Sequence, residues 1–423
     1  MSPFQYKSAV LHADGVSLAS IADAVGTPFY CYSETAIVGQ FDAYVSAFAD
    51  QDVRVCYAMK ANDNLAVLRA LADRGAGADV VSGGELKKAL VAGIPPDRII
   101  FSGVGKTQDE LVKALDAGIM QINVESFPEM AVLSAIATTQ KTTAEIAIRI
   151  NPNVDAKTHE KIATGRKQDK FGIDIDQAAE AYRRAADLPG IEAVSVAVHI
   201  GSQLVSLDPF RAAFSRVAEL VGELRDAGHD LRRVDLGGGL GIDYDGTPPP
   251  TPAAYAKVVR ETVGGMGCRI LLEPGRNLVG NAGVLVSRVI YTKEGADRDF
   301  VIVDAAMNDL IRPSLYGAHH GIRPVSKPNE SANLKSVDVV GPICETGDTF
   351  TRAREMPPIS AGDLIVFDSA GAYGAVMAST YNARPHVPEV MVRGNRFSIV
   401  RARQSIEDML SAENFADWQP STG

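Results

Sequence analysis

The chain has 423 residues, 46% of them apolar and 22% charged, and its formal net charge is −10. This length exceeds what a single hydrophobic core usually serves, so we expect two domains in a globular protein of ordinary composition. The acidic balance excludes the basic surface that a nucleic-acid partner requires.

The apolar runs and the cysteines indicate in which cellular compartment the protein is expected. No apolar run approaches the roughly 18 residues that cross a bilayer, and the N-terminus lacks the basic-then-apolar layout of a signal peptide. Cys31, Cys56, Cys268 and Cys344 are isolated, without C-x-x-C spacing, and are interpreted as free thiols. We therefore expect a cytoplasmic protein with no membrane partner.

Eight short β-rich apolar runs alternate with longer segments of helical period. The runs cover residues 53–59, 77–82, 98–103, 120–124, 145–150, 193–200, 232–238 and 268–273. The segments between them have apolar residues three and four apart and tend to end in glycine. This alternation predicts parallel strands joined by crossovers, and eight units in about 220 to 250 residues match a closed (β/α)₈ barrel. An open doubly wound sheet is the alternative architecture.

The last third of the chain has a different sequence pattern. Short alternating runs separated by Gly, Pro and Asp turns predict a mostly antiparallel β domain. The early run at 27–33 can complete that sheet, and the proline-rich 246–254 is expected to be a surface loop. We therefore predict an α/β protein, with the barrel over residues 34–280 and the β domain formed by 1–33 and 281–423.

Reactive side chains follow several predicted barrel strands, at the C-terminal ends where barrel active sites lie. They are Lys60 after the first strand, Asp79 and Glu85 around the second, His199 and Ser202 after the sixth, Gly237 to Gly241 after the seventh, and Glu273 with Arg276 after the eighth. Each has an ordinary structural explanation, since strand-end lysines reach water and glycine runs form turns. Their convergence at one mouth predicts an active site.

Two nucleotide-binding motifs are incomplete. The glycine run has Ile242 where a dinucleotide-binding G-x-G-x-x-G needs glycine. The stretch "GVGKT" (103–107) ends like a Walker loop but has Ile100 where that loop needs glycine. Both nucleotide interpretations are therefore disfavoured.

An amine, a phosphate cradle and a carboxylate at one mouth match pyridoxal 5'-phosphate, which carries an aldehyde, a phosphate and a basic ring nitrogen. Lys60 is the candidate for its Schiff base, and the glycines with Ser202 are the candidates for its phosphate. An ionised Glu273 would keep the pyridine nitrogen protonated, which makes the ring an electron sink. His199 is expected against the ring face. No metal site is predicted.

Six segments resemble, in order, motifs of the fold-type III pyridoxal-phosphate decarboxylases over about residues 25–405. They are "YAMKAN", "HIGSQL", "GGGLGI", "EPGR", "CETGD" and "GAYG". Within this family the chain is most similar to the diaminopimelate branch. The resemblance implies an alanine racemase-like fold and the decarboxylation of meso-2,6-diaminopimelate to L-lysine and CO2, the last step of lysine biosynthesis. It also implies a homodimer with shared active sites.

The same resemblance implies roles for individual residues. The implied cofactor contacts are Lys60, Asp79, Glu85, His199, Ser202, Gly237, Gly238, Gly239, Glu273, Pro274, Gly275, Arg276 and Tyr373. The implied substrate contacts are Arg276, Arg312, Tyr316, Glu345 and Tyr373, and the implied catalytic residues are Lys60, His199 and Cys344. Cys344 is the implied proton donor, and Glu345 of the partner subunit is implied to face the distal ammonium. Arg312 suits the distal carboxylate because its guanidinium donates two parallel hydrogen bonds.

The segment 158–173 resembles the specificity segment of the diaminopimelate branch. It matches at Thr164, Gly165 and 170–172 but has Lys161 where tyrosine is usual. Elsewhere Asn277 replaces a common serine. Glutamate after Cys344 distinguishes the chain from ornithine decarboxylases, where aspartate is typical. The alternatives are a decarboxylase of another basic amino acid or of carboxynorspermidine, a racemase of the same fold, and an inactive pyridoxal-phosphate-binding regulatory relative.

Overall fold

The computed structural model describes residues 2–155, 170–329 and 331–419. The chain divides into two compact units, one of residues 36–280 and the other of residues 1–35 together with 281–423. None of the helices in the described ranges is long and apolar enough to cross a membrane.

The unit of residues 36–280 is a closed barrel of parallel strands. Among the described residues, its eight strands are β5 (Val53–Ala58), β6 (Gly77–Val80), β7 (Ile99–Phe101), β8 (Gln121–Val124), β9 (Ala144–Asn151), β11 (Ile191–Ala197), β12 (Arg233–Asp235) and β13 (Arg269–Leu272). The ring closes because β13 pairs in parallel with β5, with Ile270 opposite Val53. The short β10 (Ile173–Asp174) pairs in parallel with the C-terminal end of β9. The predicted (β/α)₈ barrel is confirmed, and the open sheet was the wrong alternative.

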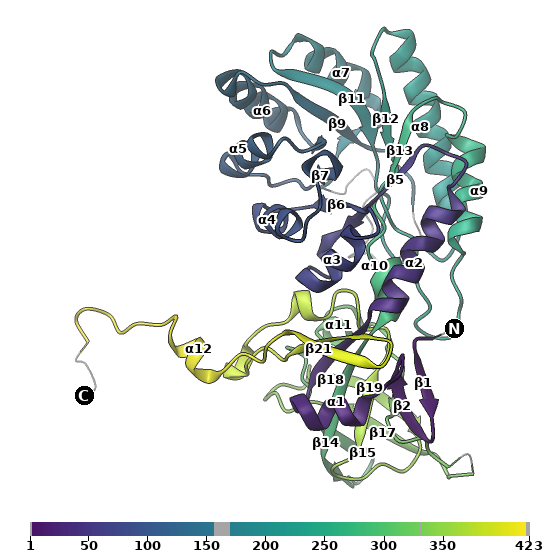
Figure 1. The fold of residues 1–423 in the computed structure, drawn as a ribbon, viewed down its shortest axis with the longest axis vertical. Coiled ribbons are helices and arrows are strands. Elements are labelled where there is room, and N and C mark those ends of the chain that lie inside the picture. Colours follow the sequence, from purple (N-terminus) through teal and green to yellow (C-terminus); the bar gives the residue numbers. More distant parts are fainter. Residues whose placement is uncertain (1, 156–169, 330, 420–423) are drawn as a thin grey trace. The chain divides into compact units, whose positions relative to one another are not determined.

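Helices lie around the outside of the barrel strands (Figure 1). They are α2 (Glu34–Ala47), α3 (Leu65–Ala72), α4 (Gly83–Val91), α5 (Gln108–Ala117), α6 (Phe127–Gln140), α7 (Ala178–Asp187), α8 (Asp208–Asp226) and α9 (Pro252–Thr262), whereas the short α10 (Arg276–Val279) follows β13 at the C-terminal strand ends. The sequence sets their limits locally. For example, α5 begins at a capping box between Thr107 and Glu110 and ends at Gly118, whose φ of 65° is left-handed. The proline-rich segment predicted as a loop over 246–254 is irregular as far as Thr251, and its last three residues form the start of α9 instead.

The side chains inside the barrel are apolar in one part and polar in another. Cys56, Ile100, Met120 and Leu271 form an apolar cluster inside it. Towards the C-terminal strand ends the buried residues become polar, and they are Asp79, Asn123, Arg149, Asp235 and Glu273. Because parallel strands bring their C-terminal ends to one mouth, these polar groups gather where the sequence predicts the site.

The other unit is a mostly antiparallel β structure. Its larger sheet has the order β18-β17-β15-β14-β4-β20-β21, with β19 pairing to β14 and β16. These strands are β4 (Phe29–Ser33), β14 (Gly283–Lys293), β15 (Asp299–Val303), β16 (Ile322–Pro324), β17 (Lys335–Val340), β18 (Thr349–Met356), β19 (Leu364–Phe367), β20 (Glu389–Arg393) and β21 (Arg396–Arg401). Two pairings, β15 with β17 and β20 with β4, are parallel.

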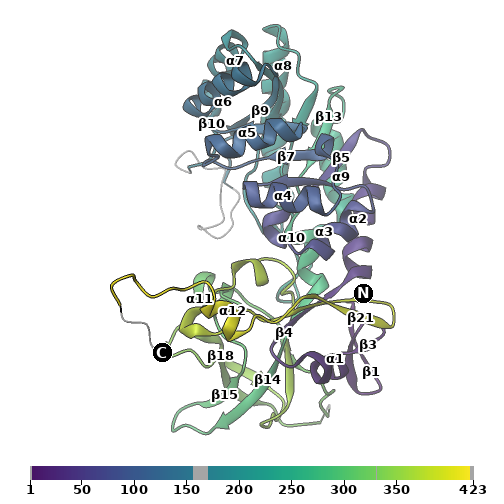
Figure 2. The same ribbon diagram turned by 60° about the vertical axis from the view of Figure 1, so that its left-hand side comes forward.

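The N-terminal segment completes this unit. Strand β4 lies between β14 and β20, and its five residues are all buried. Figure 2 shows β4 beside β14. A small sheet of β1 (Phe4–Lys7), β2 (Val10–Ala13) and β3 (Val16–Ser17) precedes α1 (Leu18–Val25). Short helices α11 (Arg312–Tyr316) and α12 (Ile406–Leu410) complete the unit. The prediction that residues 27–33 join the later sheet is confirmed.

Candidate active site

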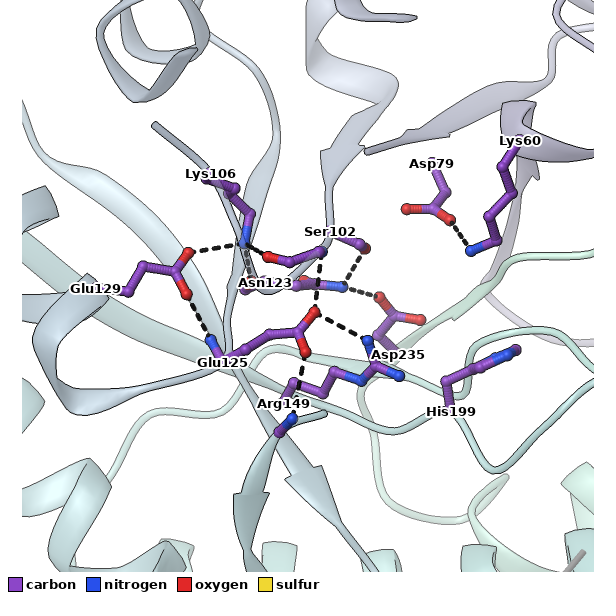
Figure 3. A network of polar contacts seen from close by, with 12 residues as sticks. Lys60, Asp79, Ser102, Lys106, Asn123, Glu125, Glu129, Arg149, His199 and Asp235 are labelled. Carbon is purple, nitrogen blue, oxygen red and sulfur yellow. Dashed lines mark hydrogen bonds and ion pairs between the residues drawn. The ribbon is translucent and has the colours of Figure 1, made fainter. Parts of the chain in front are cut away.

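Lys60 lies in a single turn that directly follows β5. Its Nζ is 3.2 Å from Oδ2 of Asp79, a fully buried residue at the end of β6 (Figure 3). The other oxygen of Asp79, Oδ1, is buried without a hydrogen-bond partner among the described residues. Glu85 in α4 accepts the N–H of Val81 at 2.8 Å, and burial raises the pKa of its carboxyl to about 7. The structure therefore brings together the lysine and both acids predicted from the first two strands.

His199 follows β11 and is held as a neutral imidazole. Its Nδ1 is 3.2 Å from the backbone N of Gly238, which can only donate, so the ring proton is placed on Nε2. Burial lowers the pKa of His199 well below its usual range, and the positive charges of Lys60 and Arg149 lower it further.

The glycines after β12 allow backbone loops to meet at close range. A Cβ on Gly238 would lie 2.2 Å from the carbonyl oxygen of Glu273, and one on Gly237 would lie 2.5 Å from that of Val198. Gly239 has a φ of 121°, and a Cβ there would lie 2.6 Å from the carbonyl oxygen of Gly201. The turns after β11, β12 and β13 are therefore packed against one another.

The "EPGR" turn in turn contacts the lysine turn. A Cβ on Gly275, which follows Pro274, would lie 3.1 Å from Cβ of Ala61 and 3.2 Å from Cβ of Ala58. The predicted residues on the first, sixth, seventh and eighth strands thus share one mouth. The N–H groups of Gly237 and Gly238 are already engaged, by Asp235 and by His199.

Glu273 is buried, and its Oε1 has no hydrogen-bond partner among the described residues. Its carboxyl is hydrogen-bonded to that of Asp235 at the end of β12. Burial raises the pKa of Glu273 well above its usual range, the negative charges of Asp235 and Asp79 raise it further, and Lys60 opposes them. Burial also raises the pKa of Asp235, to about 6. Burial and the neighbouring acids therefore favour the protonated form of Glu273 over its carboxylate.

Arg276 begins α10 and is buried. Its Nε and Nη2 donate to the Ser202 hydroxyl at 3.3 and 3.1 Å, and its Nη1 donates to the Tyr244 hydroxyl at 2.7 Å. The neighbouring Asn277, which departs from the family pattern, donates to the carbonyl of Gly241 at 2.6 Å and accepts from Gln40 at 2.7 Å. Asn277, which stands where serine is common, therefore joins the loop that contains Gly241 to helix α2.

Sequence reasoning missed a buried charge network beside this mouth (Figure 3). Arg149 on β9 donates from Nη1 to Glu125 at 2.9 Å, and Lys106 donates to Glu129 at 2.7 Å. The N–H of Glu125 donates to Glu129 at 2.9 Å, which joins the two ion pairs. Lys106 belongs to the rejected "GVGKT" stretch. The available signal was an arginine near the end of β9 and a glutamate directly after β8.

Arg312 and Tyr316 lie on α11 in the β unit. Arg312 is buried and its Nη1 is 2.8 Å from Nε2 of His320, whose Nδ1 is 2.8 Å from the carbonyl oxygen of Asp368. Since a guanidinium only donates and a carbonyl only accepts, His320 is neutral with its proton on Nδ1. Sequence reasoning missed this partner of Arg312.

Cys344 and Glu345 are exposed in the turn between β17 and β18. The N–H of Cys344 donates to the Asn382 side chain at 3.3 Å. Tyr373 follows β19 with a φ of 56°, a left-handed conformation that is costly for a bulky residue and is often found at functional sites. Arg312, Cys344, Glu345 and Tyr373 are thus all held in one unit.

Three predicted specificity positions, Lys161, Thr164 and Gly165, lie outside the described residues. The end of that segment is described. The N–H of Gly172 donates to Glu125 at 3.2 Å, and the Phe171 ring lies 4.8 Å from the guanidinium of Arg149.

The residues at the barrel mouth fit pyridoxal phosphate. Lys60 offers an amine, and Glu273 Oε1 is a buried acceptor that awaits a donor. Arg276 and Ser202 offer a cation and a hydroxyl to a phosphate beside the glycine turns.

Comparisons with known proteins agree with this chemistry. Residues 34–280 match the family model described as pyridoxal-dependent decarboxylase, pyridoxal binding domain. A diaminopimelate decarboxylase from Zymomonas mobilis is 46% identical over 423 residues, covering 99% of this chain and 100% of the relative.

Solved structures agree over similar lengths. Diaminopimelate decarboxylase from Helicobacter pylori complexed with L-lysine has a TM-score of 0.90 at 42% identity, covering 93% of this chain and 98% of that one. The enzyme from M. jannaschii in co-complex with L-lysine has a TM-score of 0.92 at 36% identity, covering 98% of each chain. The chain therefore belongs to the pyridoxal-dependent decarboxylases.

Proposed function

We propose that this protein is a diaminopimelate decarboxylase that uses pyridoxal 5'-phosphate to convert meso-2,6-diaminopimelate to L-lysine and CO2. The observation that carries the proposal is the joint presence, at one barrel mouth, of Lys60 beside Asp79 and of Glu273 with an unpartnered buried oxygen. The identity of the substrate is inferred from full-length relatives of that name, one of which was solved with the product, L-lysine.

The barrel residues hold the cofactor. Lys60 attaches it covalently, and Asp79 keeps the amine in place before attachment. Arg276 and Ser202 would hold the phosphate beside the glycine turns, where the N–H groups of Gly237 and Gly238 already donate to Asp235 and His199, and His199 would lie against the ring. With the cofactor bound, Glu273 would accept a hydrogen bond from the protonated ring nitrogen, and that positive charge would favour the ionised carboxylate, which burial alone disfavours. When bound, pyridoxal phosphate withdraws the electron pair left by the departing CO2.

The β-unit residues recognise the far end of the substrate. Arg312 is oriented by His320 and binds the distal carboxylate, with Tyr316 beside it. Glu345 binds the distal ammonium. These two charges select a substrate that carries a second amino-acid group.

Cys344 completes the reaction. Decarboxylation breaks the bond between the α-carbon and its carboxylate, and the bonding electron pair, which the bound cofactor would stabilise, must then be protonated at that carbon. The Cys344 thiol gives that carbon a proton and later regains one from solvent. The product is L-lysine, in which the protonated carbon has become the ε-carbon that carries the side-chain amine.

We further propose that the enzyme is a cytoplasmic homodimer. Cys344 and Glu345 are exposed on the β unit of a single chain, so a partner chain can receive them at its own barrel mouth. This arrangement supports the expectation that Glu345 acts in the partner's site.

One assay tests the activity. Purified protein is mixed with pyridoxal phosphate and meso-diaminopimelate, and released CO2 and lysine are measured, with ornithine, arginine and carboxynorspermidine as competing substrates. We expect turnover with meso-diaminopimelate alone, and none in Lys60→Ala. Faster turnover of another substrate would favour the alternative decarboxylases. Cofactor binding without turnover of any substrate would favour the inactive regulatory relative.

A further inference from the structure

The turn of residues 341–348, which carries Cys344 and Glu345, contains a buried acid. Cys344, Glu345, Thr346 and Gly347 are exposed, whereas Asp348 is only 3% exposed. A buried acid directly after four exposed residues needs partners, because an unpaired buried carboxylate is costly. Its contacts therefore indicate what the turn is fastened to.

The carboxylate of Asp348 joins two separate stretches of backbone. Oδ2 accepts the N–H of Ile343 at 2.7 Å, and Oδ1 accepts the N–H of Met307 at 2.7 Å. The backbone of Asp348 closes the turn on itself, since its N–H donates to the carbonyl of Glu345 at 3.0 Å and its carbonyl accepts the N–H of Gly341 at 3.1 Å. Ile343 directly precedes Cys344, and Met307 lies in the loop that leads into α11.

Two further contacts show that this fit is tight. A Cβ on Gly341 would lie 2.3 Å from Oδ2 of Asp348, so the carboxylate occupies the space that a side chain would need. The Ser314 hydroxyl on α11 donates to the carbonyl of Gly347 at 2.6 Å. The turn is thus fastened on both sides to the segment that presents Arg312.

We infer that Asp348 is a positioning residue for the decarboxylation, which fixes Cys344 and Glu345 relative to Arg312. The inference rests on the proposed function for its catalytic meaning, because the proton donor and both substrate-recognition charges depend on this one carboxylate. A displacement of about 1 Å in such a constellation costs on the order of a hundredfold in rate. A residue that merely stabilised the turn would change the free energy of unfolding and leave the rate of the folded enzyme alone.

The test compares Asp348→Asn with Asp363→Asn in the cofactor-loaded full-length enzyme. Asp363 is a matched control, because its carboxylate also accepts a backbone N–H, that of Ser360 at 2.8 Å, in an exposed turn of the same unit. Asparagine at 348 keeps the size but presents an N–H group to one of the two backbone donors. The readouts are kcat and KM for meso-diaminopimelate, the absorbance of bound cofactor, and the rate at which iodoacetamide alkylates Cys344, followed by peptide mass mapping.

For Asp348→Asn we expect a fall in kcat of tenfold or more, with normal cofactor absorbance and at least a threefold change in the Cys344 alkylation rate. Asp363→Asn should match the wild type in all of them. Wild-type kcat and alkylation rate in folded Asp348→Asn would overturn the inference. If that variant does not fold, Gly341→Ala decides in its place, because its Cβ pushes the carboxylate aside. The same changes are expected there, and an unchanged alkylation rate rejects the inference.

The alkylation rate separates this inference from the proposed function. It depends on the placement of the Cys344 thiol and needs no substrate, so it remains informative if meso-diaminopimelate is not turned over. Cys31 and Cys56 are buried and Cys268 is partly buried, which leaves Cys344 as the exposed thiol among the described residues.

Discussion

Lys60 and Glu273 show how burial assigns different tasks to two residues at one mouth. The Lys60 side chain is 36% exposed and lies beside Asp79, so its amine is accessible to an incoming aldehyde. Glu273 is buried with one carboxyl oxygen unpartnered, so its charge is costly until a donor arrives. Lys60 is therefore placed to react, whereas the charge of Glu273 depends on the group that is bound beside it.

Glu273→Gln tests that contrast. Glutamine keeps an oxygen acceptor but no negative charge, so it cannot stabilise a protonated ring nitrogen. We expect kcat to fall by about a hundredfold or more, the scale of losing one preorganised electrostatic contact. Stopped-flow assay of lysine formation and the spectrum of the bound cofactor measure the effect. Glu219→Gln, at an exposed position of α8, should have no effect, and near-normal kcat in Glu273→Gln would contradict the assignment.

Glu85 predicts a pH dependence of stability. The pKa of its carboxyl is raised to about 7 by burial, above the roughly 4.3 of an unfolded chain. The unfolded state therefore loses this proton first, and the folded state is progressively destabilised between about pH 4 and 7, with the full penalty above that range. Glu85→Gln removes the penalty and can still accept the N–H of Val81. Its stability relative to the wild type should rise from pH 4 to 7, by at most roughly 4 kcal/mol, and then stay constant.

Urea unfolding of the cofactor-free protein at pH 5 and pH 8 measures this difference. Glu110 provides a control of opposite sign, because the N–H groups of Gly83 and Thr107 lower the pKa of its carboxyl. Its contribution is present above the unfolded pKa and is lost as the pH falls. Glu110→Gln should therefore be less stable than the wild type at pH 8, with a smaller difference in acid. Equal pH profiles for both variants would refute the burial argument.

At the scale of elements, the turn after β12 requires glycine because neighbouring loops approach its backbone closely. In Gly238→Ala the new Cβ would lie 2.2 Å from the carbonyl of Glu273, so the β13 turn must shift. We expect cofactor affinity to fall at least tenfold, measured by absorbance titration of the cofactor-free protein. Gly222→Ala in α8 is the control, since no atom lies within 4 Å of its Cβ. It should stabilise the protein by about 0.5–1 kcal/mol, and normal affinity in Gly238→Ala would exclude the steric argument.

The buried network joins the loops after β7 and β8 to strand β9. Lys106 is 1% exposed at its side chain and is paired with Glu129, so Lys106→Met leaves a buried carboxylate without its cation. We expect a loss of about 3 to 5 kcal/mol in the free energy of unfolding. Lys113→Met, on the exposed face of α5, should change it by less than about 0.5 kcal/mol. Denaturant titration of both variants decides, and equal stabilities would mean that the ion pair contributes nothing.

These elements show what could be predicted from the sequence. Periodicity located the barrel strands because each is a local apolar run, and strand ends located Lys60 and Glu273 because parallel strands share a mouth. The partners of Arg149 could not be predicted, since Glu125 and Gly172 approach it only in the folded barrel. For the same reason, nothing in the sequence indicated that His320 would orient Arg312.

At the scale of the whole molecule, the proposed homodimer predicts complementation between two inactive variants. If each site needs Lys60 from one chain and Cys344 from the other, Lys60→Ala and Cys344→Ala chains can pair to form one intact site. Mixed dimers isolated with two different affinity tags should show about half the wild-type activity, because one of two symmetric sites is whole. Mixed dimers as inactive as their parents would contradict a shared site.

The position of β4 has a consequence for synthesis on the ribosome. Its buried residues, Phe29–Ser33, are made among the first, yet they pair with residues 283–286 and 389–392. At a synthesis rate of about 5–20 residues per second, the first of these partners appears on the order of 10 to 50 s later. The nascent chain therefore carries an apolar, unpaired strand while the entire barrel is translated, and this strand is where a chaperone that binds unfolded chains would act.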